Sequence, residues 1–237
     1  MKTMESYFDD MNACPCKEVF EKVEYPWEAI KKKDDIIDFS QKKIEGEVHE
    51  TAEIKGDVVI GKGTIVGSNV IIEGPCIIGE NCTIRPGAMI RAKTIVGNNV
   101  VIGHGVELKN SIIFDEVKMG TNSFVGDSIL GKGARVASGA ITGNRRFDQK
   151  EVNVKIGDET FSTGTEKFGC VMGEYARIGA NCASAPGTLI GKHSWTYANM
   201  VIRGVIPPKK LVKLRQDIEI VEKGETVLKR EDNEGNI

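Results

Sequence analysis

The chain has 237 residues, a formal net charge of -2 at pH 7 and only 6% aromatic residues, which argues against a nucleic-acid-binding protein or a membrane-surface protein. No apolar run approaches the roughly 20 residues of a membrane span, and the acidic start MKTMESYFDD is unlike a signal peptide. We therefore expect a cytoplasmic protein. Its six cysteines are too few for a disulfide scaffold, and the pair Cys14 and Cys16 lacks the further ligands of a metal site.

Residues 1–43 form a charged N-terminal flank without internal repeats. Segments 16–24 and 26–38 predict short helices, the second with Pro26 at its first helical position. We expect this flank to be a helical cap or linker that covers the first coil of the domain that follows.

Residues 44–206 repeat an apolar residue every six positions. The repeat runs through Ile54, Ile60, Val66, Ile72, Ile78, Ile84, Ile90, Val96, Ile102, Leu108 and Phe114, and it continues in two further registers, from Met119 to Val136 and from Met172 to Ile202. A period of six fits neither a helix nor a regularly alternating strand. It predicts short strands with an aliphatic residue inside and glycine or asparagine at sharp corners. Three hexads close one triangular coil, and stacked coils give an all-β, single-stranded parallel β-helix.

A polar stretch at about 143–155 interrupts the repeat. A coil wall has no room for extra residues, so the stretch predicts a loop, and loops on rigid scaffolds often carry binding groups. A tolerated surface insertion is the alternative. Cationic side chains also occur at coil corners, at Arg85 and Lys109, where an anion such as a phosphate would relieve their repulsion. A solvated charged face is the alternative for these two.

Residues 207–237 predict a C-terminal helix and tail. Pro207 and Pro208 are expected to end the β-helix, and the apolar spacing over 209–223 is typical of a surface helix.

Several motifs connect residues 26–205 with one family. They include RPGA (85–88), VELKNS (106–111), SFVGDSILG (123–131), GNRRFDQKEV (143–152), KFGCVMGEYARIGAN (167–181) and APGTLIG (185–191). With its hexads, the chain resembles the hexapeptide-repeat acyltransferases, and it is similar to the acetyltransferase half of the bifunctional sugar-1-phosphate nucleotidyltransferase/acetyltransferases. Nothing in residues 1–25 resembles the glycine-rich nucleotide loop of the other half, so we expect no pyrophosphorylase activity.

This resemblance implies a left-handed parallel β-helix that forms a homotrimer, with sites between neighbouring prisms. It also implies an acetyl-CoA donor and an acceptor that is an amino sugar 1-phosphate or a related phosphorylated sugar, in nucleotide-sugar biosynthesis and without a metal. The family's positions fall on Arg85 and Lys109 for the phosphate and sugar, on Asn144 and Lys150 for the acceptor, and on Ala180, Ala198 and Arg215 for the coenzyme.

Two departures concern the catalytic base. The family has a histidine followed three residues later by a tyrosine, where this chain has Thr121 and Phe124. Threonine cannot accept a proton near neutral pH, as histidine does. His104, one coil below, is the candidate substitute base, although a surface histidine is more often only a polar side chain. Arg135 also stands where the family tends to have a small polar residue.

Two alternatives to an active acyltransferase follow from these departures. The first is a catalytically degenerate prism that binds a ligand or serves as an assembly subunit for a separate nucleotidyltransferase. The second is a carbonic anhydrase of the same fold, whose zinc needs three converging histidines. The spacing of His49, His104 and His193 argues against that second alternative.

Overall fold

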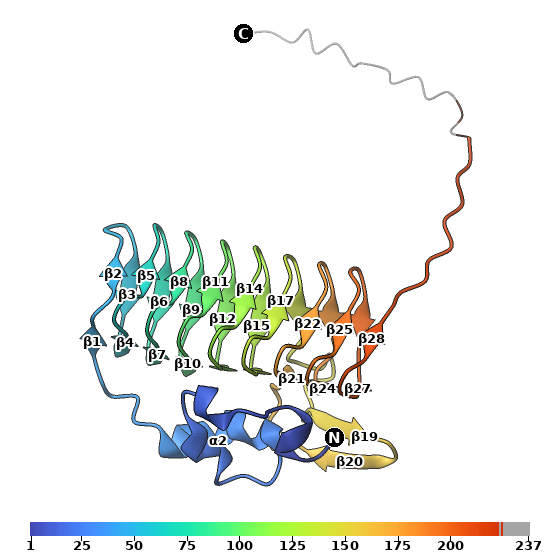
Figure 1. Ribbon diagram of the computed structural model, residues 1–237, viewed down its shortest axis with the longest axis horizontal. Coiled ribbons are helices and arrows are strands. Elements are labelled where there is room, and N and C mark those ends of the chain that lie inside the picture. Colours follow the sequence, from blue (N-terminus) through green and yellow to red (C-terminus); the bar gives the residue numbers. More distant parts are fainter. Residues whose placement is uncertain (223, 225–237) are drawn as a thin grey trace, which may run out of the picture.

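The structure is a computed structural model that describes residues 1–222 and 224 (Figure 1). It confirms the predicted parallel β-helix, in which each coil contributes one short strand to each of three sheets. Sheet A contains β1 (Lys43–Ile44), β4 (Val58–Ile60), β7 (Cys76–Ile78), β10 (Thr94–Val96), β13 (Ile112–Ile113), β16 (Ile129–Leu130), β21 (Cys170–Met172), β24 (Thr188–Ile190) and β27 (Val205–Ile206).

The other two sheets have the same parallel order. Sheet B contains β2 (Glu47–Val48), β5 (Ile65–Val66), β8 (Thr83–Ile84), β11 (Val101–Ile102), β14 (Lys118–Met119), β17 (Arg135–Val136), β22 (Arg177–Ile178), β25 (Trp195–Thr196) and β28 (Leu211–Val212). Sheet C contains β3 (Glu53–Lys55), β6 (Ile71–Glu73), β9 (Met89–Arg91), β12 (Glu107–Lys109), β15 (Phe124–Gly126), β18 (Ile141–Thr142), β23 (Ala183–Ser184) and β26 (Val201–Ile202).

The hexad residues fill the interior as predicted. Ile60 to Leu108 of the first register all lie in one continuous buried cluster, while Ile54 is partly buried against it. Each fully buried aliphatic side chain contributes about 1.5–3 kcal/mol. Asparagines such as Asn81 and Asn181 hold the left-handed corner conformation, with φ of 54° and 52°, which few side chains other than glycine and asparagine adopt readily.

The inward position predicted for Phe114 is wrong. In sheet A, Ile112 pairs with Ile95 and with Ile129, so these coils advance by 17 residues rather than 18. Ile113 therefore takes the inward position, and Phe114 points outward, where it joins a second buried cluster. That cluster holds the N-terminal flank.

The N-terminal flank contains η1 (Met4–Ser6), η2 (Met11–Ala13), α1 (Lys17–Phe20), η3 (Pro26–Glu28) and α2 (Ala29–Ile36), so helices form within both predicted segments. The flank does not cap the first coil. It lies along the outer face of sheet A (Figure 1), because that face carries a second aliphatic row that water would otherwise cover. The row contains Ile77, Ile95, Ile112, Ile129, Val171, Leu189 and Val205.

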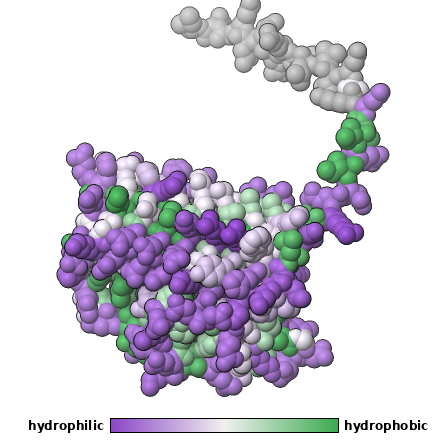
Figure 2. Space-filling view, in the orientation of Figure 1, coloured by the Kyte–Doolittle hydropathy of each residue, from purple (hydrophilic) through white to green (hydrophobic). Residues whose placement is uncertain are grey.

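Aromatic and polar contacts fix the flank on sheet A. Phe8 stacks on Phe114 with ring centroids 4.8 Å apart, and Phe20 meets both rings edge-on. The buried carboxylate of Glu174 accepts hydrogen bonds from the backbone amides of residues 9 and 10, each at 2.8 Å. These contacts leave sheets B and C as the uncovered faces. The side of the molecule drawn in Figure 2 is largely hydrophilic.

The interruption of the repeat is longer than 143–155. The chain leaves the coils after β18 and returns at β21, so the excursion covers residues 143–169. It includes the antiparallel hairpin of β19 (Asn153–Ile156) and β20 (Glu159–Ser162). Gly157, with a φ of 60°, and Asp158 form its turn, a dipeptide that favours such turns. The hairpin packs on the flank through Phe161, which contacts Tyr25 and Trp27.

The helix predicted over 209–223 is wrong for the part that the structure describes. Residues Leu211–Val212 form β28, which pairs with β25, so the β-helix extends beyond 206. Residues 213–222 have no regular structure. A short helix without a packing surface is marginal in water, whereas the edge of sheet B offers ready backbone partners. None of the described helices has both the length and the apolar composition needed to cross a bilayer.

Candidate functional site

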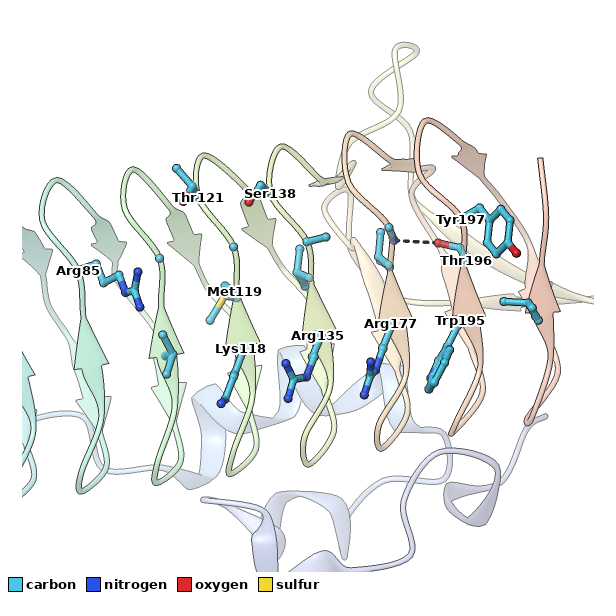
Figure 3. A pocket seen from close by; sticks show the side chains of 18 residues that line it. Arg85, Lys118, Met119, Thr121, Arg135, Ser138, Arg177, Trp195, Thr196 and Tyr197 are labelled. Atoms are coloured by element: carbon cyan, nitrogen blue, oxygen red, sulfur yellow. Dashed lines mark hydrogen bonds between the residues drawn. The ribbon is translucent and has the colours of Figure 1, made fainter. Parts of the chain in front are cut away.

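A groove of about 580 Å³ runs over the outer face of sheet B (Figure 3). We refer to it as the sheet B groove. Its walls come from strands β8 to β28 and from the corners between sheets B and C. The polar and aromatic side chains that line it are Arg85, Lys118, Thr121, Arg135, Ser138, Arg177, Trp195, Thr196 and Tyr197.

Three cations stack along the sheet B groove. Lys118 pairs in register with Arg135, and Arg135 with Arg177, so their side chains extend from successive strands on the same face (Figure 3). We call this row the cation ladder. Among the described residues, no carboxylate forms an ion pair with any of the three. The Arg177 guanidinium lies 4.4 Å from the ring centroid of Trp195, a cation–π contact.

The corner that follows sheet B holds the candidate base. His104 Nδ1 lies 2.6 Å from the carbonyl oxygen of Pro86. A carbonyl only accepts hydrogen bonds, so Nδ1 carries the proton and Nε2 carries the free lone pair. The 17-residue advance stacks Thr121 above His104. Arg85 and Thr121 both line the sheet B groove, so the corner with His104 forms its border.

The predicted acceptor residues Lys109 and Asn144 meet at a different corner, between sheets C and A. Both donate to the buried carboxylate of Asp127, from Lys109 Nζ at 3.4 Å and from Asn144 Nδ2 at 2.5 Å. Asn110 Nδ2 donates to the same carboxylate at 2.6 Å. Asn110 in turn accepts a 2.7 Å hydrogen bond from Lys33 of α2, whose side chain is fully buried.

Burial lowers the pKa of Lys33, although the neighbouring Asp34 carboxylate acts in the opposite direction. The network therefore joins three parts of the chain at one point, namely the flank, the coil corner and the start of the excursion. The coil below contributes Arg91, which pairs in register with Lys109 and forms a 2.9 Å ion pair with Glu107.

The two groups of predicted residues are separate within one chain. Arg85 and His104 lie at the B–C corner, whereas Lys109 and Asn144 lie at the C–A corner, on the opposite edge of sheet C. Arg91, rather than Arg85, is the arginine beside Lys109. The single shared cleft expected from the sequence is not formed inside one prism.

Lys150 lies on an exposed part of the excursion, where its backbone amide donates to Asp148 at 3.3 Å. Arg146 forms a two-bond ion pair with the same carboxylate, which holds the pKa of Asp148 far below its usual range. Phe147 between them is fully exposed. A second hollow of about 690 Å³ lies between this part of the excursion and strands β23 and β26 of sheet C.

Ala180 and Ala198 stack on successive coils, as their spacing predicted, and the amide of Asn199 donates to the Ala180 carbonyl at 2.8 Å. They adjoin the sheet B groove, which includes Gly179 and Tyr197. Arg215 is exposed and lies beyond the last strand. The roles of these residues toward a coenzyme stay predictions.

Sequence reasoning missed the cation ladder and Asp127. The excursion separates Arg135 from Arg177 in the sequence, so a count by 18 does not bring them together. The register of the repeat on each side of the excursion is the signal that could have aligned them. Asp127, inside the motif SFVGDS, was only an acidic residue in a conspicuous motif until its burial was visible.

Comparisons with known proteins agree with this architecture. The family model described as the GMPPB C-terminal domain matches residues 72–221. The chain is 35% identical over 199 residues to the bifunctional protein GlmU of Methanococcus maripaludis, covering 84% of this chain and 48% of that protein. It is 34% identical over 157 residues to a bifunctional sugar-1-phosphate nucleotidylyltransferase/acetyltransferase of Sulfurisphaera tokodaii, covering 66% of this chain and 39% of the relative. The chain thus spans about half or less of these curated relatives.

Among solved structures, LpxA of Acinetobacter baumannii matches at 13% identity with a TM-score of 0.38, covering 73% of this chain and 70% of that one. PerB of Caulobacter crescentus, solved in complex with CoA and GDP-perosamine, matches at 18% identity with a TM-score of 0.25, covering 77% and 58%.

Proposed function

Because the chain belongs to the family of GMPPB C-terminal domains, and because its curated relatives include bifunctional nucleotidylyltransferase/acetyltransferases, we propose that it is an acyltransferase of sugar-nucleotide pathways. Its donor is acetyl-CoA, and its acceptor is an amino sugar 1-phosphate or a related phosphorylated sugar. The reaction is attack of the acceptor amine on the thioester carbonyl, which forms an amide, releases the coenzyme thiol and transfers one amine proton to a base.

The observation that carries this proposal is the orientation of His104. Its Nδ1 is occupied by the Pro86 carbonyl at 2.6 Å, so its Nε2 is the atom available to accept the amine proton. A base whose second nitrogen is held in this way keeps the required tautomer and orientation. His104 thereby replaces the histidine that Thr121 lacks, from the coil directly below it.

The chain's other groups fit the two substrates. The cation ladder supplies positive charge without competing carboxylates, as the phosphates of a coenzyme require. Lys109 and Asn144 present an ammonium and an amide that suit a sugar phosphate, and Arg91 lies beside Lys109. Because the B–C and C–A corners are apart in one chain, a homotrimer that brings the C–A corner of one prism to the B–C corner of its neighbour completes the site.

The test is release of the coenzyme thiol from acetyl-CoA with a panel of amino sugar phosphates and amino sugar nucleotides. His104→Ala should lower kcat by about 10²–10⁴-fold, the usual contribution of a general base. His49→Ala is the matched control, because His49 is also an exposed corner histidine whose Nδ1 is hydrogen-bonded, to Thr51 at 3.0 Å. An unchanged rate in His104→Ala would show that this histidine is not the base.

The positions of Thr121 and Phe124 favour one alternative function. A prism that has lost the histidine and tyrosine of its relatives can persist as a binding or assembly subunit that pairs with a separate nucleotidyltransferase. This alternative predicts no turnover with any acceptor, together with retained ligand binding and co-purification with a nucleotidyltransferase. Measurable turnover that depends on His104 rules it out.

A further inference from the structure

The cation ladder carries an inference of its own. Like charges directly opposite each other on neighbouring strands destabilise a sheet. Here Lys118, Arg135 and Arg177 are in register on consecutive strands of sheet B, and none has an ion-pair partner in the described part of the chain. A fold that keeps three aligned cations unneutralised is suited to a ligand that supplies the negative charge.

The exposure of other charged groups shows that this arrangement is unusual within the same prism. At the next edge, Lys109 is neutralised by Asp127, Arg91 by Glu107, and Lys132 by Asp10. The sheet B groove therefore differs from the rest of the surface in charge compensation rather than in the number of cations.

An aromatic end adjoins the cation ladder. Trp195 follows Arg177 in register on β25, and Tyr197 lies two residues further. Trp195 and Tyr197 are 45% and 47% exposed, which leaves ring surface available for stacking on a flat base. At the other end, the hydroxyl residue Thr121 and the guanidinium of Arg85 line the groove (Figure 3).

The dimensions suit a small ligand. The step between neighbouring strands is about 4.8 Å, so the row from Lys118 to Trp195 spans roughly 14 Å. The groove volume of about 580 Å³ lies in the ordinary range for sites that bind small molecules. A polymer such as nucleic acid would need a longer basic surface than one row of three side chains.

We propose that the sheet B groove binds the nucleoside diphosphate portion of a ligand. Its phosphates lie along the cation ladder, where the forked guanidinium groups of Arg135 and Arg177 bind phosphate oxygens in pairs. The base lies against the exposed rings of Trp195 and Tyr197. The remainder of the ligand extends past Lys118 toward Arg85 and Thr121. Two ligands share this chemistry, namely the coenzyme and a nucleotide-linked sugar acceptor, and the choice between them rests on the proposed function.

The test is direct binding of ADP, UDP, GDP and CoA, measured by calorimetry and by tryptophan fluorescence. The chain has two tryptophans, and Trp27 is buried against Tyr25. Quenching by a bound base therefore reports on Trp195. We expect saturable binding that weakens with added salt, because screening acts on exposed charges.

Arg135→Gln should weaken that binding about 10-fold or more, as expected for the loss of a charge-assisted hydrogen bond to phosphate. Arg177→Lys keeps the charge but loses the fork, so it should weaken binding less than Arg177→Gln. Lys62→Gln is the matched control, because Lys62 is an exposed corner cation outside the groove. Thermal unfolding of each variant checks that the fold is retained.

The outcomes separate the two sources of the ligand. Tighter binding of CoA than of all three free diphosphates identifies the coenzyme, whereas tighter binding of UDP or GDP than of CoA identifies a nucleotide-linked sugar. Absence of binding by all four compounds, or affinities that are equal in the wild type and Arg135→Gln, overturns the proposal. No turnover is involved, so retained nucleotide binding in a protein that transfers no acyl group removes only the proposed function.

Discussion

The buried carboxylate of Asp127 makes a specific prediction about both stability and the acceptor loop. In Asp127→Asn, the new amide retains the side-chain shape but has one oxygen to offer to the three donors of Lys109, Asn110 and Asn144. Removal of one partner from a buried ion pair costs about 3–5 kcal/mol. The Lys109 side chain is 21% exposed, so water compensates part of the loss, and we expect the low end, about 3 kcal/mol.

In a chain of this size, about 3 kcal/mol corresponds to a decrease in Tm of roughly 6–12 °C. Differential scanning fluorimetry and urea unfolding measure this change. Hydrogen exchange should also show faster exchange at the start of the excursion, because Asn144 loses its anchor, and a larger KM for the acceptor should accompany it.

Asp148→Asn is the matched control, since Asp148 lies in the same excursion and pairs with Arg146 at the surface. Exposed pairs contribute little to stability, so this variant should melt like the wild type. Equal Tm values for Asp127→Asn and Asp148→Asn would refute the reasoning, because the network at Asp127 would then have no more weight than a surface pair.

Three further predictions concern the flank and the buried groups. Phe8→Ala removes the ring that stacks on Phe114 and should cost about 3–5 kcal/mol; limited proteolysis should then cut the flank while the coils stay resistant, and unchanged cleavage would contradict this. Burial lowers the pKa of Lys33, so unfolding takes up a proton, and the stability of the wild type relative to Lys33→Met should rise with pH toward the unfolded pKa of Lys, about 10.4; parallel pH profiles would refute it. Burial raises the pKa of Cys76 to about 11 and that of Cys170 to about 12, so a thiol reagent should leave the folded protein unlabelled at pH 8 and label six cysteines after unfolding.

Much of the fold was predictable because the hexad pattern is local. Ile60 and Ile78 belong to the same column whatever the rest of the chain does. The position of the flank was not predictable in this way. Its docking depends on the outward row that includes Ile95 and Ile129, and each of these residues precedes an inward one, so the row reads as part of a strand rather than as a binding surface for another segment.

The error over 209–223 has a related cause. The spacing of Leu211, Val212 and Leu214 fits a helix and a strand about equally well over a few residues. The open edge of sheet B, which lies far back in the sequence at Trp195, decides between the two.

The candidate site was predictable in parts. The convergence of Lys109 and Asn144 follows from the motifs that carry them, and the structure brings them to one carboxylate. Arg85 was expected in the same place, but a corner residue's destination depends on which edge of the sheet its turn occupies. That property is set by the count of residues in each coil, and here the count changes from 18 to 17.

The flank on sheet A also bears on how the molecule melts. In a stack where each turn touches only the turns beside it, either end can peel away while the remainder persists. Here one strap is tied to turns far apart, from Lys93 through Asp34 to Glu174 through the amides of residues 9 and 10. Such bracing links distant turns directly, so the middle of the stack should come apart in a single cooperative event, and only the first turns beyond the strap are free to fray.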